Sequence, residues 1–226
     1  MDGLSRRRLI DLSHPIEPGM TTYPGLPAPA VSEFLSREAS RGNYAPGTTF
    51  SIARIEMVAN TGTYVDAPFH RFAAGADVAS LPLERLADLD GVVVEKGTGR
   101  AFDADHLAER NLEGKAVLLR SGWDAHWRTP AYSEGHPFVT RRGAEALAAA
   151  RPALVGIDSM NIDDTEDGTR PAHTLLLEAG IPIAEHLCNL ADLPAEGFRF
   201  HCVPAPFSGV GSFPVRAYAV LEERAP

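Results

Sequence analysis

The chain has 226 residues, a formal net charge of −9 and a hydrophobic content of 44%. We expect residues 1–226 to form one domain, because this length suffices to bury a substantial core. No apolar run approaches the roughly eighteen residues that a membrane helix requires, and the N-terminus lacks the apolar stretch of a secretory signal. We therefore expect a cytoplasmic protein with no membrane partner. The acidic charge also excludes nucleic acid as a partner, although Arg6–Arg8 form a small basic cluster.

Short apolar runs alternate with segments of helical spacing along the chain. Within residues 10–29 the pattern predicts a strand followed by a long ordered loop. Further along the chain it predicts a half-buried strand over 48–57, a strand over 91–95, a helix over 103–110, a strand over 116–120, a helix over 140–150, and strands over 153–158 and 217–221. This alternation predicts an α/β fold in a single domain, with a mixed β-sheet and flanking helices. Cys188 and Cys202 are too few for a disulfide framework, and we expect both to be buried apolar residues.

The segment from Asn60 to His70 is rich in polar groups at alternate positions. In an extended chain, residues two apart share a face, so Asn60, Tyr64, Asp66 and His70 would point the same way. An amide, a phenol, a carboxylate and an imidazole would then converge, as in a catalytic site. The alternative is a polar loop in which Asp and Asn cap turns.

This segment resembles the signature HxGTHxDxPxH of the cyclase family, which includes bacterial kynurenine formamidases and isatin hydrolases. Five positions match it: Gly62, Thr63, Asp66, Pro68 and His70. Further matches follow in order along the chain: Asp11-Leu12-Ser13, Met20, Tyr23-Pro24-Gly25, Ser121-Gly122-Trp123-Asp124, Gly156-Ile157-Asp158, Asp163, His173, Glu185, Pro204, Gly209 and Arg216. The resemblance implies a cyclase/formamidase-like fold of the swivelling β/β/α type, a small-molecule substrate, and a homodimer or homotetramer.

In that family, the two early histidines and the aspartate of the signature bind a divalent metal, usually zinc or manganese. In this chain Asn60 and Tyr64 occupy the positions of those two histidines. Neutral amide and phenol oxygens are poor ligands for such an ion. Asp66, His173 and Glu185 match the positions that hold the second ion in two-metal members, so the resemblance implies zinc or manganese at this trio. The alternative is a hydrogen-bonded polar cluster without a metal.

His70 matches the family's catalytic histidine, and the resemblance gives it the role of general base. Imidazole suits that role because it titrates near neutral pH. We expect a hydrolase acting on a C–N or C–O bond of a cyclic or acylated amide or a lactone. Two alternatives stay open. One is a metal-independent cyclase or dehydratase, in which Tyr64 and Asn60 donate hydrogen bonds to a carbonyl oxygen. The other is a non-catalytic protein that kept the fold.

Overall fold

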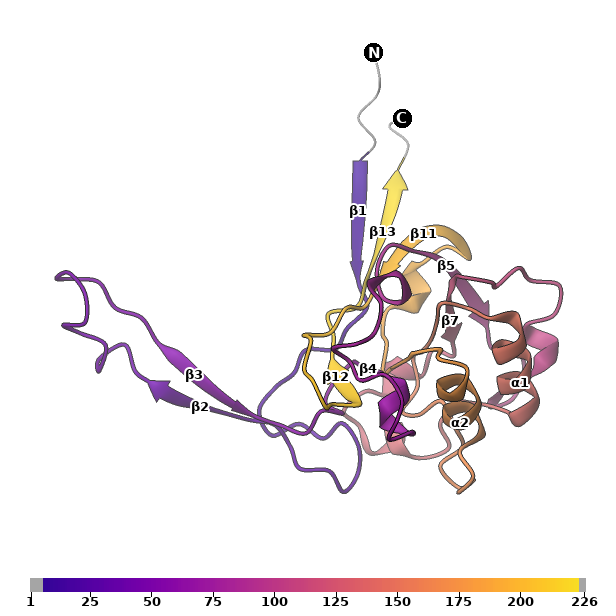
Figure 1. The fold of residues 1–226 in the computed structure, drawn as a ribbon, viewed down its shortest axis with the longest axis horizontal. Helices are drawn as coiled ribbons and strands as arrows, with labels where there is room; N and C mark the ends of the chain where they lie inside the picture. Colours follow the sequence, from indigo (N-terminus) through magenta and orange to yellow (C-terminus); the bar gives the residue numbers. More distant parts are fainter. Residues whose placement is uncertain (1–5, 224–226) are drawn as a thin grey trace, which may run out of the picture.

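The fold is dominated by one large mixed β-sheet (Figure 1). The computed structural model of the chain describes residues 6–223, so residues 1–5 and 224–226 of the expected domain lie outside the described part. Within residues 6–223, nine strands pair in the order β1-β13-β11-β5-β7-β9-β10-β4-β12. Their bounds are β1 Arg6–Asp11, β4 Tyr64–Asp66, β5 Leu89–Glu95, β7 Ala116–Arg120, β9 Leu154–Ile157, β10 Ile183–Glu185, β11 Glu196–His201, β12 Ser212–Pro214 and β13 Tyr218–Glu223.

The centre of the sheet is parallel and its two flanks are antiparallel. β5, β7, β9 and β10 run parallel to one another. β11, β13 and β1 on one side and β4 and β12 on the other pair antiparallel. The carboxyl ends of the parallel strands therefore lie at one edge of the sheet, and the antiparallel strand β4 brings its first residue back to that edge. In α/β sheets ligands bind outside such carboxyl ends.

Both faces of the central strands are buried, which explains their nearly continuous apolar sequence. Helices α1 (Arg141–Ala150) and α2 (Pro171–Glu178) cover one face, where Leu147 and Leu176 join a core with Val117 and Ile157. The opposite face packs against a second core that includes Phe200. Neither helix of the described region is long and apolar enough to cross a membrane.

Strands β2 (Ala30–Leu35) and β3 (Ile52–Glu56) form a separate hairpin that extends away from the large sheet (Figure 1). The side chains along the hairpin are mostly exposed, including those of Val31, Phe34 and Ile55. We call residues 30–56 the arm. The two-stranded pair β6 (Ala101–Phe102) and β8 (Phe138–Val139) completes the strands of the described region.

The structure confirms the predicted fold class and corrects two of the predicted elements. The helix over 140–150 is present as α1, and its first turn is capped by the Thr140 hydroxyl, which accepts a hydrogen bond from the Gly143 amide at 3.0 Å. The helix over 103–110 is wrong: only a 3₁₀ turn, Ala104–His106, forms, and the chain turns away at Glu109, whose φ is +62°. The strand over 48–57 is present as β3, but its expected half-burial is wrong, because β3 lies in the exposed arm. Cys188 and Cys202 are both buried free thiols, as expected.

Candidate active site

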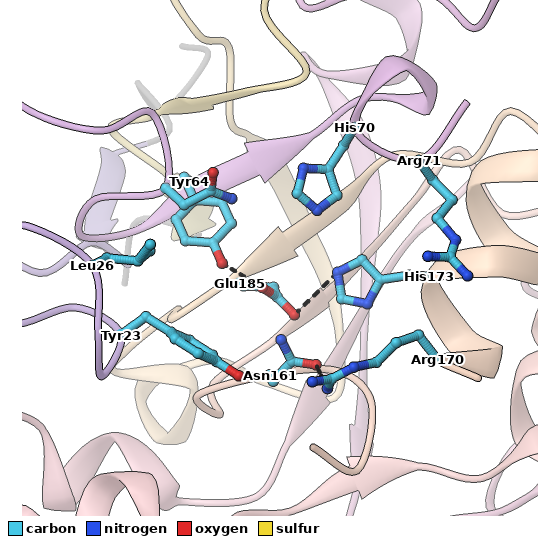
Figure 2. Close-up of a pocket in the computed structure, with 10 residues that line it drawn as sticks. Tyr23, Leu26, Tyr64, His70, Arg71, Asn161, Arg170, His173 and Glu185 are labelled. Atoms are coloured by element: carbon cyan, nitrogen blue, oxygen red, sulfur yellow. Dashed lines mark hydrogen bonds and ion pairs between the residues drawn. The ribbon is translucent and has the colours of Figure 1, made fainter. Parts of the chain in front are cut away.

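A cavity of about 360 Å³ opens at the carboxyl edge of the parallel strands, a volume suited to a small molecule (Figure 2). The sequence-predicted residues Asn60, Tyr64, His70, His173 and Glu185 all contribute to its wall, which is lined by Tyr23, Leu26, Asn60, Tyr64, His70, Arg71, Asn161, Arg170, His173 and Glu185. Asp66 is fully buried behind them. The structure therefore brings the predicted residues into one neighbourhood.

The register of β4 explains how Tyr64 and Asp66 reach this cavity. Side chains alternate along a strand, so Tyr64 and Asp66 share the face that α2 covers, whereas Val65 packs in the core of the opposite face. Tyr64 lies directly opposite Glu185 of β10, and its hydroxyl donates a hydrogen bond to Glu185 Oε2 at 2.6 Å. Asp66 lies opposite Ser212 of β12, and the Ser212 hydroxyl donates to Asp66 Oδ1. Cross-strand pairing thus fixes both contacts.

The expectation of one extended segment from Asn60 to His70 is wrong outside β4, because only Tyr64–Asp66 form a strand. Gly62 has a φ of +68°, and Pro68–His70 form a 3₁₀ turn. The imidazole of His70 nevertheless points into the cavity (Figure 2). Its Nδ1 lies 2.9 Å from the Ser212 hydroxyl oxygen and 3.6 Å from Asp66 Oδ1. Gly211 permits this approach, since a Cβ there would lie 2.6 Å from the His70 Cα.

His173 enters from the first turn of α2 and is oriented by Asp163. The Asp163 carboxylate accepts hydrogen bonds from the backbone amides of Ala172 at 2.6 Å and His173 at 3.1 Å, and it lies 2.6 Å from His173 Nδ1. The other ring nitrogen, Nε2, is directed between Asp66 Oδ2 at 3.5 Å and Glu185 Oε1 at 3.7 Å. Helix capping and ring orientation are therefore performed by one carboxylate.

The buried charges around His173 shift one another's pKa values. Burial raises the pKa of Glu185 to about 7, although the charge of His173 acts in the opposite direction. Burial disfavours the charged form of His173, but Glu185, Asp163 and Asp66 together raise its pKa to about 10. Burial, Glu185 and Asp66 raise the pKa of Tyr64, so its phenol stays protonated as a donor. Three carboxylates around one imidazole favour a cation at this place, whether a proton or a metal ion.

The donor set fits a single divalent ion. One atom each from Asp66, His70 and His173 lie within 4.8 Å of one another. Asp66 Oδ2 is buried and finds no hydrogen-bond partner in the described part of the chain, as expected of an oxygen directed at a cation. The contact between Asp163 and His173 Nδ1 is the arrangement by which carboxylates orient metal-binding histidines. Glu185, the third predicted ligand, lies beside this group, and each of its oxygens accepts one hydrogen bond.

Sequence reasoning gave no role to several residues of the site. Ser212 and Asn161 carry no motif in the chain, and Arg170 reads as an ordinary residue before a helix. Asp163 appeared among the matches to the family but without a function, and Arg71 directly follows His70. Adjacency to a candidate base was a usable signal for Arg71 alone, because the other contacts join segments that are distant in sequence.

A mixed sheet with a carboxylate and imidazole cluster in a cavity at its carboxyl edge is the arrangement of a hydrolase active site. The chain matches the family described as "Putative cyclase" over residues 10–164, and it therefore belongs to the cyclase family.

Relatives agree with this assignment over almost the whole chain. The kynurenine formamidase of Erythrobacter litoralis (strain HTCC2594) is 29% identical over 219 residues, which are 97% of this chain and 95% of that protein. A solved structure described as a potential metal-dependent hydrolase with cyclase activity is 26% identical, with a TM-score of 0.77 over 97% of this chain and 100% of the other. Isatin hydrolase A from Labrenzia aggregata has a TM-score of 0.81 at 22% identity, over 96% and 94% of the two chains, and shows the same fold. These comparisons confirm the expectation of a hydrolase of this family.

Proposed function

We propose that this enzyme hydrolyses a C–N or C–O bond of a cyclic or acylated amide or of a lactone, with His70 as the general base. The observation that carries the proposal is the chain of contacts from Asp66 through Ser212 to His70 at the wall of the cavity. The relative that acts as a kynurenine formamidase supports the class of reaction.

Hydrogen-bond donors and acceptors along this chain of contacts determine which nitrogen of His70 carries a proton. Ionised Asp66 only accepts hydrogen bonds, so the single hydroxyl proton of Ser212 is directed to Asp66 Oδ1. The Ser212 oxygen must then accept from His70, which places a proton on Nδ1 of the imidazole. Nε2 retains its lone pair, and this nitrogen takes a proton from a water that attacks the substrate carbonyl and later returns it to the leaving group.

Asn161 supports the carbonyl side of the reaction. Its Oδ1 accepts the backbone N–H of Asp163 at 2.9 Å and a guanidinium N–H of Arg170 at 3.5 Å. Because an N–H donates only to the oxygen of the amide, the Nδ2 group is directed to the cavity, where Figure 2 shows it near Glu185. An amide donor held in this way stabilises the negative charge that develops on a carbonyl oxygen under attack.

We assign the metal to Asp66, His173 and Glu185, with zinc or manganese as the ion. Each oxygen of Glu185 has a second lone pair beyond the bonds from Tyr64 and from the Ile162 amide, so it can still serve as a ligand. An ion at this place would supply Lewis-acid polarisation of the substrate carbonyl. This assignment leaves His70 free as the base.

The metal-independent cyclase or dehydratase is less well supported by the contacts of Tyr64 and Asn60. The Tyr64 hydroxyl has one proton, and its 2.6 Å contact with Glu185 uses it. Asn60 Nδ2 is directed to Asp66 Oδ1 at 3.4 Å. Tyr64 therefore has no donor left for a substrate carbonyl, and Asn60 keeps only one of its two N–H groups, whereas no hydrogen bond within residues 6–223 uses the Nδ2 group of Asn161.

We also infer that the enzyme is a homodimer or homotetramer that uses the arm. An isolated two-stranded hairpin is marginally stable in water, yet the arm exposes Val31, Phe34, Ile52 and Ile55. A second copy of the chain would cover these side chains and would stabilise the hairpin.

The direct test is hydrolysis of N-formylkynurenine, isatin and a panel of lactones by the purified protein, with and without added zinc or manganese. We expect turnover of at least one substrate, and a loss of kcat of about a hundredfold or more in His70→Asn. His126→Asn is the matched control, because His126 does not line the cavity. Absence of turnover across the whole panel, or equal rates for both variants, contradicts the proposal.

A further inference from the structure

Two arginines, Arg71 and Arg170, line the same cavity as His70 and His173. In Figure 2 both lie on the side of His173, across the cavity from Tyr23 and Leu26. The chain as a whole is acidic, with a net charge of −9, so two guanidinium groups at the wall of one cavity form a local exception. Their position beside the proposed chemistry raises the question of what they bind.

Arg170 has an unusual backbone conformation. It precedes α2 with a φ of +48° and a ψ of +62°, in the left-handed region that is unfavourable for a residue with a Cβ by about 1–2 kcal/mol. Its guanidinium makes long contacts of 3.5 Å each with Asn161 Oδ1 and the Asp164 carbonyl. No carboxylate oxygen lies within 4.0 Å of it in residues 6–223. Most of its five N–H donors are therefore available to a ligand.

Arg71 directly follows the proposed base and is exposed at the cavity. In the described part of the chain its side chain has neither a hydrogen bond nor an ion pair, whereas Arg120 and Arg216, for example, are paired with Glu95 and Asp11. Guanidinium groups bind carboxylates through two parallel hydrogen bonds, which makes arginine the residue best suited to recognise them.

The remaining walls divide the cavity into three parts. Tyr23 and Leu26 supply an apolar side. Glu185, with Asp66 behind it, belongs to the group that holds the proposed metal ion, which polarises a substrate carbonyl. An anionic group therefore belongs beside the arginines, the apolar body of the ligand beside Tyr23 and Leu26, and a neutral carbonyl near His70.

We propose that Arg71 and Arg170 form a carboxylate-binding subsite, and that the substrates of this enzyme are carboxylic acids in which an apolar body joins the carboxylate to the scissile amide or lactone. This inference rests on the proposed hydrolase function for its statement about substrates. The subsite itself binds a carboxylate whether or not the bound molecule is hydrolysed.

Binding is measured first, with benzoate and the neutral benzamide of similar shape as probes, by isothermal titration calorimetry on the full chain as purified. Benzoate binds at least tenfold more tightly than benzamide. Arg170→Gln and Arg71→Gln each weaken benzoate about tenfold and leave benzamide unchanged. Arg170→Lys keeps the charge but loses the paired donors of the guanidinium, so its affinity for benzoate lies between those of the unaltered protein and Arg170→Gln. Arg110→Gln makes the same change of charge at an exposed residue outside the cavity and retains the affinity of the unaltered protein.

Equal affinities for the two probes overturn the subsite. A preference for benzoate that survives both substitutions also overturns the subsite, since another cation would then hold the carboxylate. The subsite is likewise overturned if Arg110→Gln weakens benzoate as much as Arg71→Gln and Arg170→Gln do. Because Arg71 is exposed, Arg71→Gln tests the subsite even if Arg170→Gln fails to fold.

Turnover is then compared for N-formylanthranilate and formanilide, which differ only in the carboxylate. The ratio of their kcat/KM values exceeds ten in the unaltered enzyme and falls toward one in Arg71→Gln. If benzoate is selected but no substrate of the wider panel is hydrolysed, the subsite stands and the proposed function fails. If substrates are hydrolysed without regard to the carboxylate, the proposed function stands and the subsite fails.

Discussion

The Ser212 hydroxyl oxygen lies 2.9 Å from Nδ1 of His70, and the two residues are 142 positions apart in the sequence. The same hydroxyl donates a hydrogen bond to buried Asp66, so Ser212 links the ring of the proposed base to a carboxylate whose position is fixed by burial. Without it, the ring would be free to rotate and to exchange its tautomer.

Replacing Ser212 by alanine tests this link. We expect kcat to fall about 10- to 100-fold with little change in KM, because the imidazole loses its orientation and not its identity. Steady-state kinetics on a substrate found in the panel measures the effect, with Ser133→Ala at a partly exposed serine outside the cavity as the control. A change confined to KM would show that Ser212 acts on binding and not on His70.

Metal content distinguishes the two candidate ligand sets. If Asp66, His173 and Glu185 hold the ion, Glu185→Gln lowers bound zinc or manganese at least tenfold, whereas His70→Ala retains it. Elemental analysis of protein purified without a chelator or a metal-affinity tag gives the answer. The opposite pattern would assign the ion to the group formed by Asp66, His70 and His173.

The lowered pKa of His14 predicts that part of the free energy of unfolding is lost in acid. Burial lowers the pKa of His14 to about 4, although Asp124 acts in the opposite direction. The unfolded chain binds this proton near pH 6.5, so the stability contributed by neutral His14 is present above pH 6.5 and is lost as the pH falls toward 4. The loss is about 1–2 kcal/mol after allowance for the partial exposure of the ring.

Substitution of His14 by phenylalanine isolates this component. His14 stacks on Trp127 with ring centroids 4.1 Å apart, and a phenyl ring keeps that contact without titrating. Urea denaturation at pH 6.5 and pH 4 should give a smaller fall in the free energy of unfolding for His14→Phe than for the unaltered protein. Equal falls would mean that other groups account for the acid sensitivity.

The arm predicts the assembly state. A charge in place of the exposed apolar residue Phe34, as in Phe34→Glu, should produce monomers in light scattering coupled to size exclusion, because the second copy would have to bury a carboxylate. Leu83→Glu introduces the same charge at an exposed leucine outside the arm and should leave the assembly intact. A dimer that persists in Phe34→Glu would place the interface elsewhere.

Much of the fold follows from local patterns in the chain. The central strands are recognisable because both of their faces are buried, so nearly every residue is apolar, and α1 is recognisable by its Thr140 cap. The predicted helix over 103–110 failed because helical spacing by itself does not determine helix length: after one turn the chain reverses at Glu109. Alternation in β3 indicated a strand correctly, but it does not reveal whether a second layer covers it.

The sequence by itself determined the central strands of the sheet and the family, and it singled out Asp66, His70, His173 and Glu185 as candidates, since these depend on short patterns and on matched motifs. Only the tertiary structure decided that Ser212 orients His70, that Asp163 orients His173, and that Arg71 and Arg170 share a cavity. The physical reason is that a hydrogen bond depends on distances of a few tenths of an ångström. Those distances are set by the strand register and helix packing of segments that lie far apart along the chain.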